Sequence, residues 1–175
     1  VSFPTFELEK IMAPNQSINA LLSKIINKSD LIINNKDYRV IVQGDAASTY
    51  AIALSAFNNK KEVIHLEAGL RTYNLNSPFP EEGYRKMISQ IANVHLCPTE
   101  KAMENLNSEG INENVHLVGN TIVDSYKLIL NKGKVSSNIE KIVENTDEFY
   151  LCTLHRRENR EYFNNMWSEL NEIAE

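Results

Sequence analysis

The sequence lacks the features that mark membrane, secreted and disulfide-rich proteins. No apolar run approaches the roughly 20 residues of a transmembrane helix, and the N-terminal stretch VSFPTFELEK lacks the charged-then-apolar order of a signal peptide. Only two of the 175 residues are cysteines, Cys97 and Cys152, which stand far apart and without CxxC spacing. We therefore expect a cytoplasmic protein with no membrane partner, in which both cysteines are buried and unpaired.

Positive charge is scarce as well. The chain carries 18 lysines and arginines against 23 aspartates and glutamates, so its net charge is −5 and its pI is about 5.5. It has no basic stripe of the kind that neutralises a phosphate backbone, so we do not expect a nucleic-acid partner. Hydrophobic residues make up 42% and charged residues 23%, which is typical of a globular protein with a core of its own.

Glycine is also infrequent, and the six glycines never form the GxGxxG loop of a dinucleotide-binding fold. Short apolar runs nevertheless alternate with helical periodicity, which predicts the α/β class: a Rossmann-like parallel sheet with helices on both faces. The predicted strands are residues 38–44, 62–68, 94–98, 115–119 and 149–154. The predicted helices are residues 17–26 or slightly beyond, 46–58, 81–92, 100–108 and 121–131.

The composition changes after the fifth predicted helix. We assign residues 1–131 to most of an N-terminal Rossmann-like domain and residues 132–147 to a polar linker with a short helix near 139–144. Residues 148–175 are predicted as strand, turn and helix, the beginning of a C-terminal Rossmann-like domain. One strand and one helix cannot bury their apolar faces alone, so we expect the chain to be incomplete relative to a two-domain design.

Polar side chains follow several of the predicted strands. In an open parallel sheet, ligands bind outside the carboxyl ends of the strands, and Asp45, Glu67 and Asn120 stand at such ends. Asp45 has two interpretations: it caps the helix that follows, or it belongs to a site. A carboxylate at an apolar sheet edge is costly unless it is paired with a cation or has a function. Glu67 therefore either pairs with Arg71 or Arg85 or has an acid/base function.

The segment SPFPEEGYRKM adds carboxylates and a cation. Pro78 and Pro80 stiffen the entry into the predicted helix, so its free N–H groups and Arg85 make a place that favours an anion. Glu81 and Arg85 stand at i and i+4, which alone would make only a surface pair worth a few tenths of a kcal/mol. We expect Glu82 to be solvated.

A histidine and two arginines follow the last predicted strand. His155 alone would usually be structural, but the guanidinium groups of Arg156 and Arg157 match phosphate oxygens and favour a phosphate contact. The other histidines lie within predicted strands without the spacing of metal ligands, and we expect core or sheet-face positions for them: His65, His95 and His116.

Six motifs, in this order, resemble the non-hydrolysing UDP-N-acetylglucosamine 2-epimerases: QGDAAST, HLEAGLRT, SPFPEEGYRK, CPTE, GNTIVDS and TLHRREN. Each motif alone is weak, but six in register are specific, and the resemblance covers residues 14–175. It implies two Rossmann-like domains of the GT-B type, with the active site in the cleft between them, usually in a homodimer. It also implies a reaction that inverts C2 of UDP-GlcNAc to give UDP-ManNAc for surface polysaccharides.

The resemblance implies a mechanism that requires no cofactor and no metal. UDP is eliminated across C1 and C2 to leave 2-acetamidoglucal, and it adds back after a proton returns to the opposite face of C2. This chemistry needs more than one acid/base group and positively charged groups around the departing diphosphate. Which carboxylate serves which face of C2 stays open.

Five positions correspond, residue by residue, to the catalytic site of that family. Asp45, Glu67 and Glu81 match its acidic groups, and Arg85 and His155 match its arginine and histidine. Contacts with the substrate are expected from Arg71, Asn120, Arg156 and Arg157.

The chain also departs from the family pattern. Gln43 stands where a histidine is usual, which removes a titratable group beside Asp45, and Ala46 and Ala47 stand where threonines are usual. The N-terminal strand with its GTRPE-like turn and the C-terminal stretch that grips uridine are not in the sequence, so we expect this chain not to turn over substrate alone. Two alternatives stay open: a hydrolysing relative that releases ManNAc and UDP, and a non-catalytic fragment or interaction module.

Overall fold

The computed structural model describes residues 11–34, 39–133, 136–145, 149, 151–153 and 161–174. The chain divides into two compact units, residues 1–129 and residues 130–175. The predicted linker at 132–147 and the predicted second domain at 148–175 both fall in the second unit, and the border between them stays a prediction.

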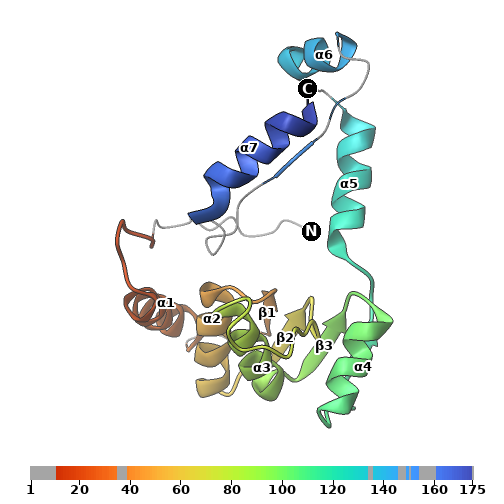
Figure 1. Ribbon diagram of the computed structural model, residues 1–175. Helices are drawn as coiled ribbons and strands as arrows, with labels where there is room; N and C mark the ends of the chain where they lie inside the picture. The colour runs from red at the N-terminus through yellow and green to blue at the C-terminus, as the bar shows by residue number, and fades with distance from the viewer. Residues whose placement is uncertain are drawn as a thin grey trace. The chain divides into compact units, whose positions relative to one another are not determined.

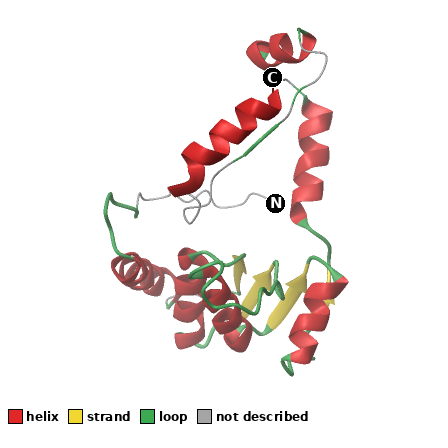
Figure 2. Ribbon diagram, viewed as in Figure 1, coloured by secondary structure: helices red, strands yellow, loops and turns green. Residues whose placement is uncertain are grey.

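A four-stranded parallel sheet forms the framework of the first unit (Figure 1, Figure 2). Its strands are β1 (Val40–Gln43), β2 (Val63–Leu66), β3 (Val94–Cys97) and β4 (Val115–Leu117), hydrogen-bonded in the order β1-β2-β3-β4. Parallel neighbours need a crossover connection, and the segments between successive strands each contain a helix. The first four predicted strands and their alternation with helices are confirmed.

The described part of the first unit contains α1 (Ile18–Ile33), α2 (Ala47–Asn58), α3 (Glu81–Ile91), α4 (Glu100–Ser108) and the start of α5 (Thr121–Lys132). Capping chemistry sets two of the starts: Ser17 Oγ accepts the N–H of Ala20 at 3.2 Å, and Thr99 Oγ1 accepts the N–H of Ala102 at 3.1 Å. α1 runs well past residue 26 because Ile33 is buried near the end of its apolar face. None of the helices that the structure describes has the length and apolar character needed to cross a bilayer.

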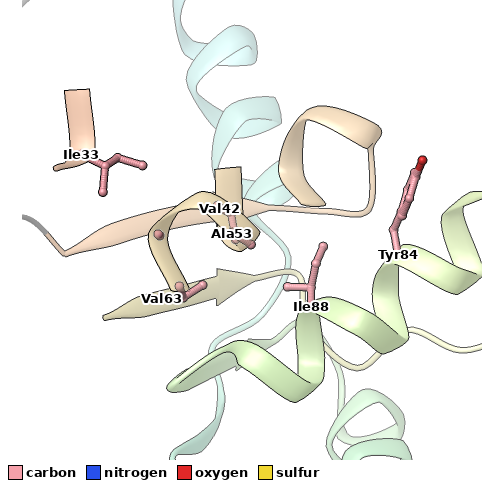
Figure 3. Close-up of a cluster of buried hydrophobic side chains, with 7 residues drawn as sticks. Ile33, Val42, Ala53, Val63, Tyr84 and Ile88 are labelled. Carbon is pink, nitrogen blue, oxygen red and sulfur yellow. The ribbon is translucent and has the colours of Figure 1, made fainter. Parts of the chain in front are cut away.

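One face of the sheet carries the core of the first unit. The strand register places Val42, His65 and His95 side by side on this face, and all three are at most 4% exposed. α2 and α3 contribute the side chains that pack against it, and burying one aliphatic side chain contributes about 1.5–3 kcal/mol. The cluster drawn in Figure 3 consists of Ile33, Val42, Ala53, Ala56, Val63, Tyr84 and Ile88.

The described part of the second unit contains α6 (Ser137–Glu144) and α7 (Phe163–Ala174), where helices were predicted. The strand predicted at 149–154 is wrong for its described residues, 149 and 151–153, which have no regular structure. A strand forms only against a neighbouring strand, and none of the described residues pairs with this segment, in which Leu151 is 87% exposed. Cys97 is buried as predicted, but Cys152, in this unpacked segment, is exposed, so that part of the cysteine prediction is wrong.

Gly69, in the turn that follows β2, has φ +85° and packs against the backbone of α4. A Cβ atom at this position would lie 2.2 Å from the carbonyl oxygen of Ala102. We expect Gly69→Ala to lower the free energy of unfolding by about 1–3 kcal/mol, because the turn must hold a strained φ and also move away from a backbone oxygen. Urea denaturation followed by circular dichroism measures this change.

Gly83→Ala is the matched control for this substitution. Gly83 lies inside α3, and apart from its chain neighbours and the nearby backbone of the helix itself, nothing comes within 4 Å of a Cβ built there. The control should leave stability unchanged or raise it by about 0.5–1 kcal/mol, since alanine favours the helix. Equal losses from both substitutions would contradict the packing role of Gly69.

His65 and His95 are buried register partners on β2 and β3. Nε2 of His65 donates to the carbonyl oxygen of Gly44 at 2.9 Å, while Nδ1 of each ring has no partner among the described residues. Burial is the largest influence on both rings: it lowers the pKa of His65, and with the neighbouring His65 and Arg71 it lowers the pKa of His95 to about 4. Both rings are therefore neutral in the folded protein at neutral pH.

We expect mild acid to destabilise the first unit through these two rings. Histidines of the unfolded chain take up a proton near pH 6.5 while the folded rings stay neutral, so the free energy of unfolding falls as the pH drops from 6.5 towards about 4. Each ring contributes a slope of up to about 1.4 kcal/mol per pH unit. His95→Gln should flatten this slope in urea denaturation between pH 6.5 and about 5.

His116→Gln is the control, since His116 is exposed on β4. It should leave the pH dependence of stability as it is in the unsubstituted chain. The same slope in His95→Gln as in the unsubstituted chain would show that the buried ring does not set this pH dependence.

Candidate functional site

The carboxyl ends of β1 and β2 form the sheet edge at which two predicted acidic residues lie. The N–H of Gly44 donates to the carbonyl oxygen of Leu66 at 3.0 Å, so the ladder continues past β1 and sets Asp45 and Glu67 on adjacent strand ends. A Cβ atom on Gly44 would lie 3.6 Å from Oε2 of Glu67, which places this carboxylate beside the backbone that leads to Asp45. The structure thus brings both residues to one edge.

Asp45 is joined to α3 through Arg85. Oδ2 of Asp45 accepts a hydrogen bond from Nε of Arg85 at 2.7 Å and lies 2.7 Å from Nη2, in a pair whose side chains are 29% and 16% exposed. The helix-cap interpretation of Asp45 is wrong, because α2 begins after Ala46 without a side-chain cap and the Asp45 carboxylate binds the guanidinium instead. Oδ1 of Asp45 has no hydrogen-bond donor among the residues that the structure describes.

Glu82 is the second carboxylate that binds Arg85, and it is fully buried. Nη1 of Arg85 donates to Oε2 at 3.1 Å, and the N–H groups of Thr72 and Tyr73 donate to Oε2 and Oε1 at 3.0 Å each. Burial acts to raise the pKa of Glu82, but the hydrogen bonds from Thr72, Tyr73 and Arg85 outweigh it, so the pKa is lowered. The expectation that Glu82 is solvated is wrong.

The sequence shows which residues share a helix face with Glu82, but not what covers that face. Glu82, Arg85 and Ser89 stand at i, i+3 and i+7 of α3, which is the spacing of one helix face. Glu82 and Ser89 are both buried, although they are polar. Polar residues at this spacing are also typical of a solvated helix face, so the burial of Glu82 is decided by the loop whose N–H groups donate to it.

Glu67 has no ion pair and no hydrogen bond within the described part of the chain. The interpretation that pairs it with Arg71 or Arg85 is wrong, because both arginines bind other carboxylates. Its backbone has φ +67°, in the left-handed region that a non-glycine residue rarely adopts. An unpaired, partly buried carboxylate on a strained backbone suits a functional group.

Arg71, a predicted substrate contact, has its side chain entirely buried. Nε and Nη2 donate to the two carboxylate oxygens of Glu109 at 2.9 and 2.8 Å. Nη2 also donates to Oγ of Ser89 at 2.9 Å, and Nη1 donates to the carbonyl oxygen of Leu70 at 2.9 Å. Arg71 therefore fastens the loop after β2 to α3 and to the end of α4, and this geometry gives it a structural role.

Glu81 is the first residue of α3, where a negative charge is favourable at the helix N-terminus. Burial, the neighbouring Tyr50 and the charge of Glu81 raise the pKa of Tyr84, whose ring stacks on Tyr50 at a centroid distance of 5.0 Å. The surface pair of Glu81 with Arg85 is not formed within the described residues. Glu81 thus shares a helix with Arg85 without an ion pair to it.

Asn120 lies after β4, where its side chain caps α5. Oδ1 of Asn120 accepts the N–H of Ile122 at 3.0 Å, as a helix cap does. The last residue of β1 contacts the first residue of α5, because Nε2 of Gln43 donates to Oγ1 of Thr121 at 3.4 Å. Asn120 is exposed at this edge of the sheet.

The remaining predicted site residues, His155, Arg156 and Arg157, lie outside the described residues. Within the described ranges, no group of three His, Cys, Asp or Glu side chains could hold a metal ion. A depression of about 390 Å³ lies along α3 and contains none of the predicted site residues. Its lining consists of Lys86, Met87, Gln90 and Glu109.

Comparison of sequences identifies relatives that match 85% or more of this chain. The family model described as UDP-N-acetylglucosamine 2-epimerase matches residues 2–175. A UDP-N-acetylglucosamine 2-epimerase of Neisseria meningitidis serogroup A is 40% identical over 157 residues, which are 85% of this chain and 42% of that protein. The chain spans less than half the length of the curated relatives that it matches.

Solved structures of UDP-GlcNAc 2-epimerases share the fold. The enzyme of Methanocaldococcus jannaschii, in complex with UDP-GlcNAc and UDP, has a TM-score of 0.79 at 33% identity, over 91% of this chain and 45% of that chain. The Neisseria meningitidis enzyme bound to UDP-GlcNAc has a TM-score of 0.66 at 42% identity, over 77% of this chain and 37% of that chain. The predicted Rossmann-like α/β class of the GT-B type is confirmed. The chain belongs to the UDP-N-acetylglucosamine 2-epimerase family.

Proposed function

We propose that the protein carrying this chain inverts C2 of the sugar in UDP-GlcNAc and so interconverts it with UDP-ManNAc. The observation that supports this most directly is the strand edge at which Arg85 holds Asp45 while Glu67 lies nearby without an ion pair. Two solved relatives are described as bound to UDP-GlcNAc. Family membership and this carboxylate-rich edge together favour proton chemistry on a sugar nucleotide.

The first half-reaction of the proposal is an elimination. A carboxylate removes the proton from C2, the electron pair of that C–H bond forms the C1–C2 double bond, and the C1–O bond breaks to release UDP. The products are 2-acetamidoglucal, UDP and a protonated carboxyl group. The C2 proton is only weakly acidic, so the base must be placed against it and the departing diphosphate must be stabilised.

The second half-reaction returns UDP to the sugar. A second carboxyl group gives a proton to the opposite face of C2, the electron pair of the double bond forms the new C–H bond, and an oxygen of UDP bonds to C1. One carboxyl group then holds an extra proton and the other has lost one. Exchange with solvent restores both, so in D2O the group that returns a proton to C2 carries deuterium.

Three carboxylates are proposed for these proton transfers. Glu67 has no partner that would hold its charge, and Oδ1 of Asp45 is free while Arg85 occupies Oδ2, as far as the described residues show. Glu81, at the N-terminus of α3, is the third candidate.

Residues that bind the diphosphate are proposed from the resemblance. His155 would stand in the site, and Arg156 and Arg157 carry guanidinium groups that suit phosphate oxygens. Asn120 is proposed as a substrate contact at the sheet edge, whereas the buried hydrogen bonds of Arg71 remove it from the proposed contacts. A homodimer that supplies surface polysaccharide synthesis is proposed on the same resemblance, and a cytoplasmic location is proposed from the sequence.

The proposal is tested by the fate of the proton at C2. The protein that carries this chain, given UDP-GlcNAc in D2O, should place deuterium at C2 and form UDP-ManNAc, as followed by NMR. Asp45→Asn, Glu67→Gln and Glu81→Gln should each lower kcat by about 10²–10⁴-fold, because each removes an acid/base group. Glu113→Gln, an exposed carboxylate of the same unit, is the control and should keep the rate.

Other outcomes of this experiment separate the alternatives. Release of free ManNAc and UDP would identify a hydrolysing enzyme. Turnover of Glu67→Gln at the rate of the control would contradict the role of the strand edge. If no product forms and UDP does not raise the melting temperature, the chain belongs to a non-catalytic module, because a ligand that binds the folded state raises its stability.

A further inference from the structure

Glu82 is a buried carboxylate for which the proposed reaction has no direct use. It is 0% exposed, and it binds three donors: the N–H groups of Thr72 and Tyr73 at 3.0 Å each, and Nη1 of Arg85 at 3.1 Å. A buried charge is costly unless donors surround it, and these three donors meet that requirement. The carboxylate therefore links two neighbouring segments, the loop after β2 and the first turns of α3.

Arg85 connects this buried carboxylate to the site. Its guanidinium group donates through Nη1 to Glu82 and through Nε to Oδ2 of Asp45, with Nη2 also 2.7 Å from Oδ2. Because the guanidinium is planar, fixing Nη1 on one side fixes the direction of the edge formed by Nε and Nη2. The three residues form one row of carboxylate, guanidinium and carboxylate.

The loop held by Glu82 also carries the chain from Glu67 to Glu81. Thr72 donates its N–H to Glu82, and its hydroxyl donates to the carbonyl oxygen of Ser77 at 2.7 Å, so the loop is fixed at its beginning and across its bend. Glu82 is thus bound to the loop that follows one proposed carboxylate and is adjacent in sequence to another. Its position bears on all three proposed acid/base groups.

We propose that Glu82 is a positioning residue of the site: through Arg85 it holds Oδ2 of Asp45 and leaves Oδ1 available for proton transfer. The inference rests on the proposed function for its chemistry, and on the row of hydrogen bonds for its geometry. Glu82 itself does not touch the substrate. A residue that merely stabilises the fold would show similar burial, so the test has to separate the two roles.

The first experiment needs no activity. The chain is labelled with ¹⁵N-arginine, and the Nε–H signal of Arg85 is assigned by its loss in Arg85→Lys. Glu82→Gln should speed the exchange of this N–H with solvent by at least about tenfold, because one charged hydrogen bond that orients the guanidinium is lost. Glu113→Gln should leave it unchanged, and unchanged exchange in Glu82→Gln would overturn the proposal.

The second experiment is a double-substitution cycle in the protein that carries this chain. Glu82→Gln should lower kcat by about 10²-fold with KM within about twofold, because the acid/base group is misplaced while binding is kept. In the Asp45→Asn background the same substitution should cause no further loss, since the group that it positions is already gone. Equal losses in both backgrounds would show a merely structural role.

Glu82→Asp keeps the result decisive if Glu82→Gln does not fold. Aspartate retains the charge on a side chain shorter by one methylene, so kcat should fall by less than in Glu82→Gln and again only when Asp45 is present. An equal loss in the Asp45→Asn background would overturn the positioning role. Absence of any turnover in the unsubstituted protein would refute the proposed function, and the exchange of Arg85 Nε–H would still decide whether Glu82 positions the guanidinium.

Discussion

A charged carboxylate that is buried away from solvent is stable only where hydrogen-bond donors surround it. Three such donors, from two segments of the chain, bind the buried carboxylate of Glu82. This requirement ties the loop after β2 to α3. It also sets the direction of Arg85, which reaches across to Asp45 at the end of β1. The sheet edge, the loop and the helix are consequently organised around one buried negative charge, and the candidate site depends on that arrangement.

Two arginines of the first unit have different tasks. The guanidinium of Arg71 donates hydrogen bonds to Glu109, Ser89 and a backbone carbonyl, and its side chain is entirely buried. Arg85 is partly exposed and binds one buried and one partly exposed carboxylate. Because both cations are engaged elsewhere, Glu67 is left without an ion pair in the described part of the chain.

The order of the strands explains how side chains that are far apart in the sequence become neighbours. Parallel strands bring their carboxyl ends together, so residues separated by long helices become neighbours without any local sequence relation. Glu67 follows β2 directly, Asp45 follows β1 after one glycine, and α3 brings Arg85 to the same edge. The proposed elimination and re-addition need more than one acid/base group. Here one carboxylate is held by a guanidinium and the other has no ion pair within the described residues.

The sequence by itself determined the helices and strands of the first unit and the residues that stand at the carboxyl ends of those strands. Apolar runs of strand length, helical periodicity and the cap at Thr99 are local signals, so four strands and the helices between them could be predicted, and with them the strand-end positions of Asp45 and Glu67. Only the tertiary structure decided the partners. Arg85 binds Asp45 from far along the chain, and the burial of Glu82 depends on a loop that folds over α3. Periodicity reports the face of a helix but not what covers it, and that is why a carboxylate expected in solvent lies at zero exposure.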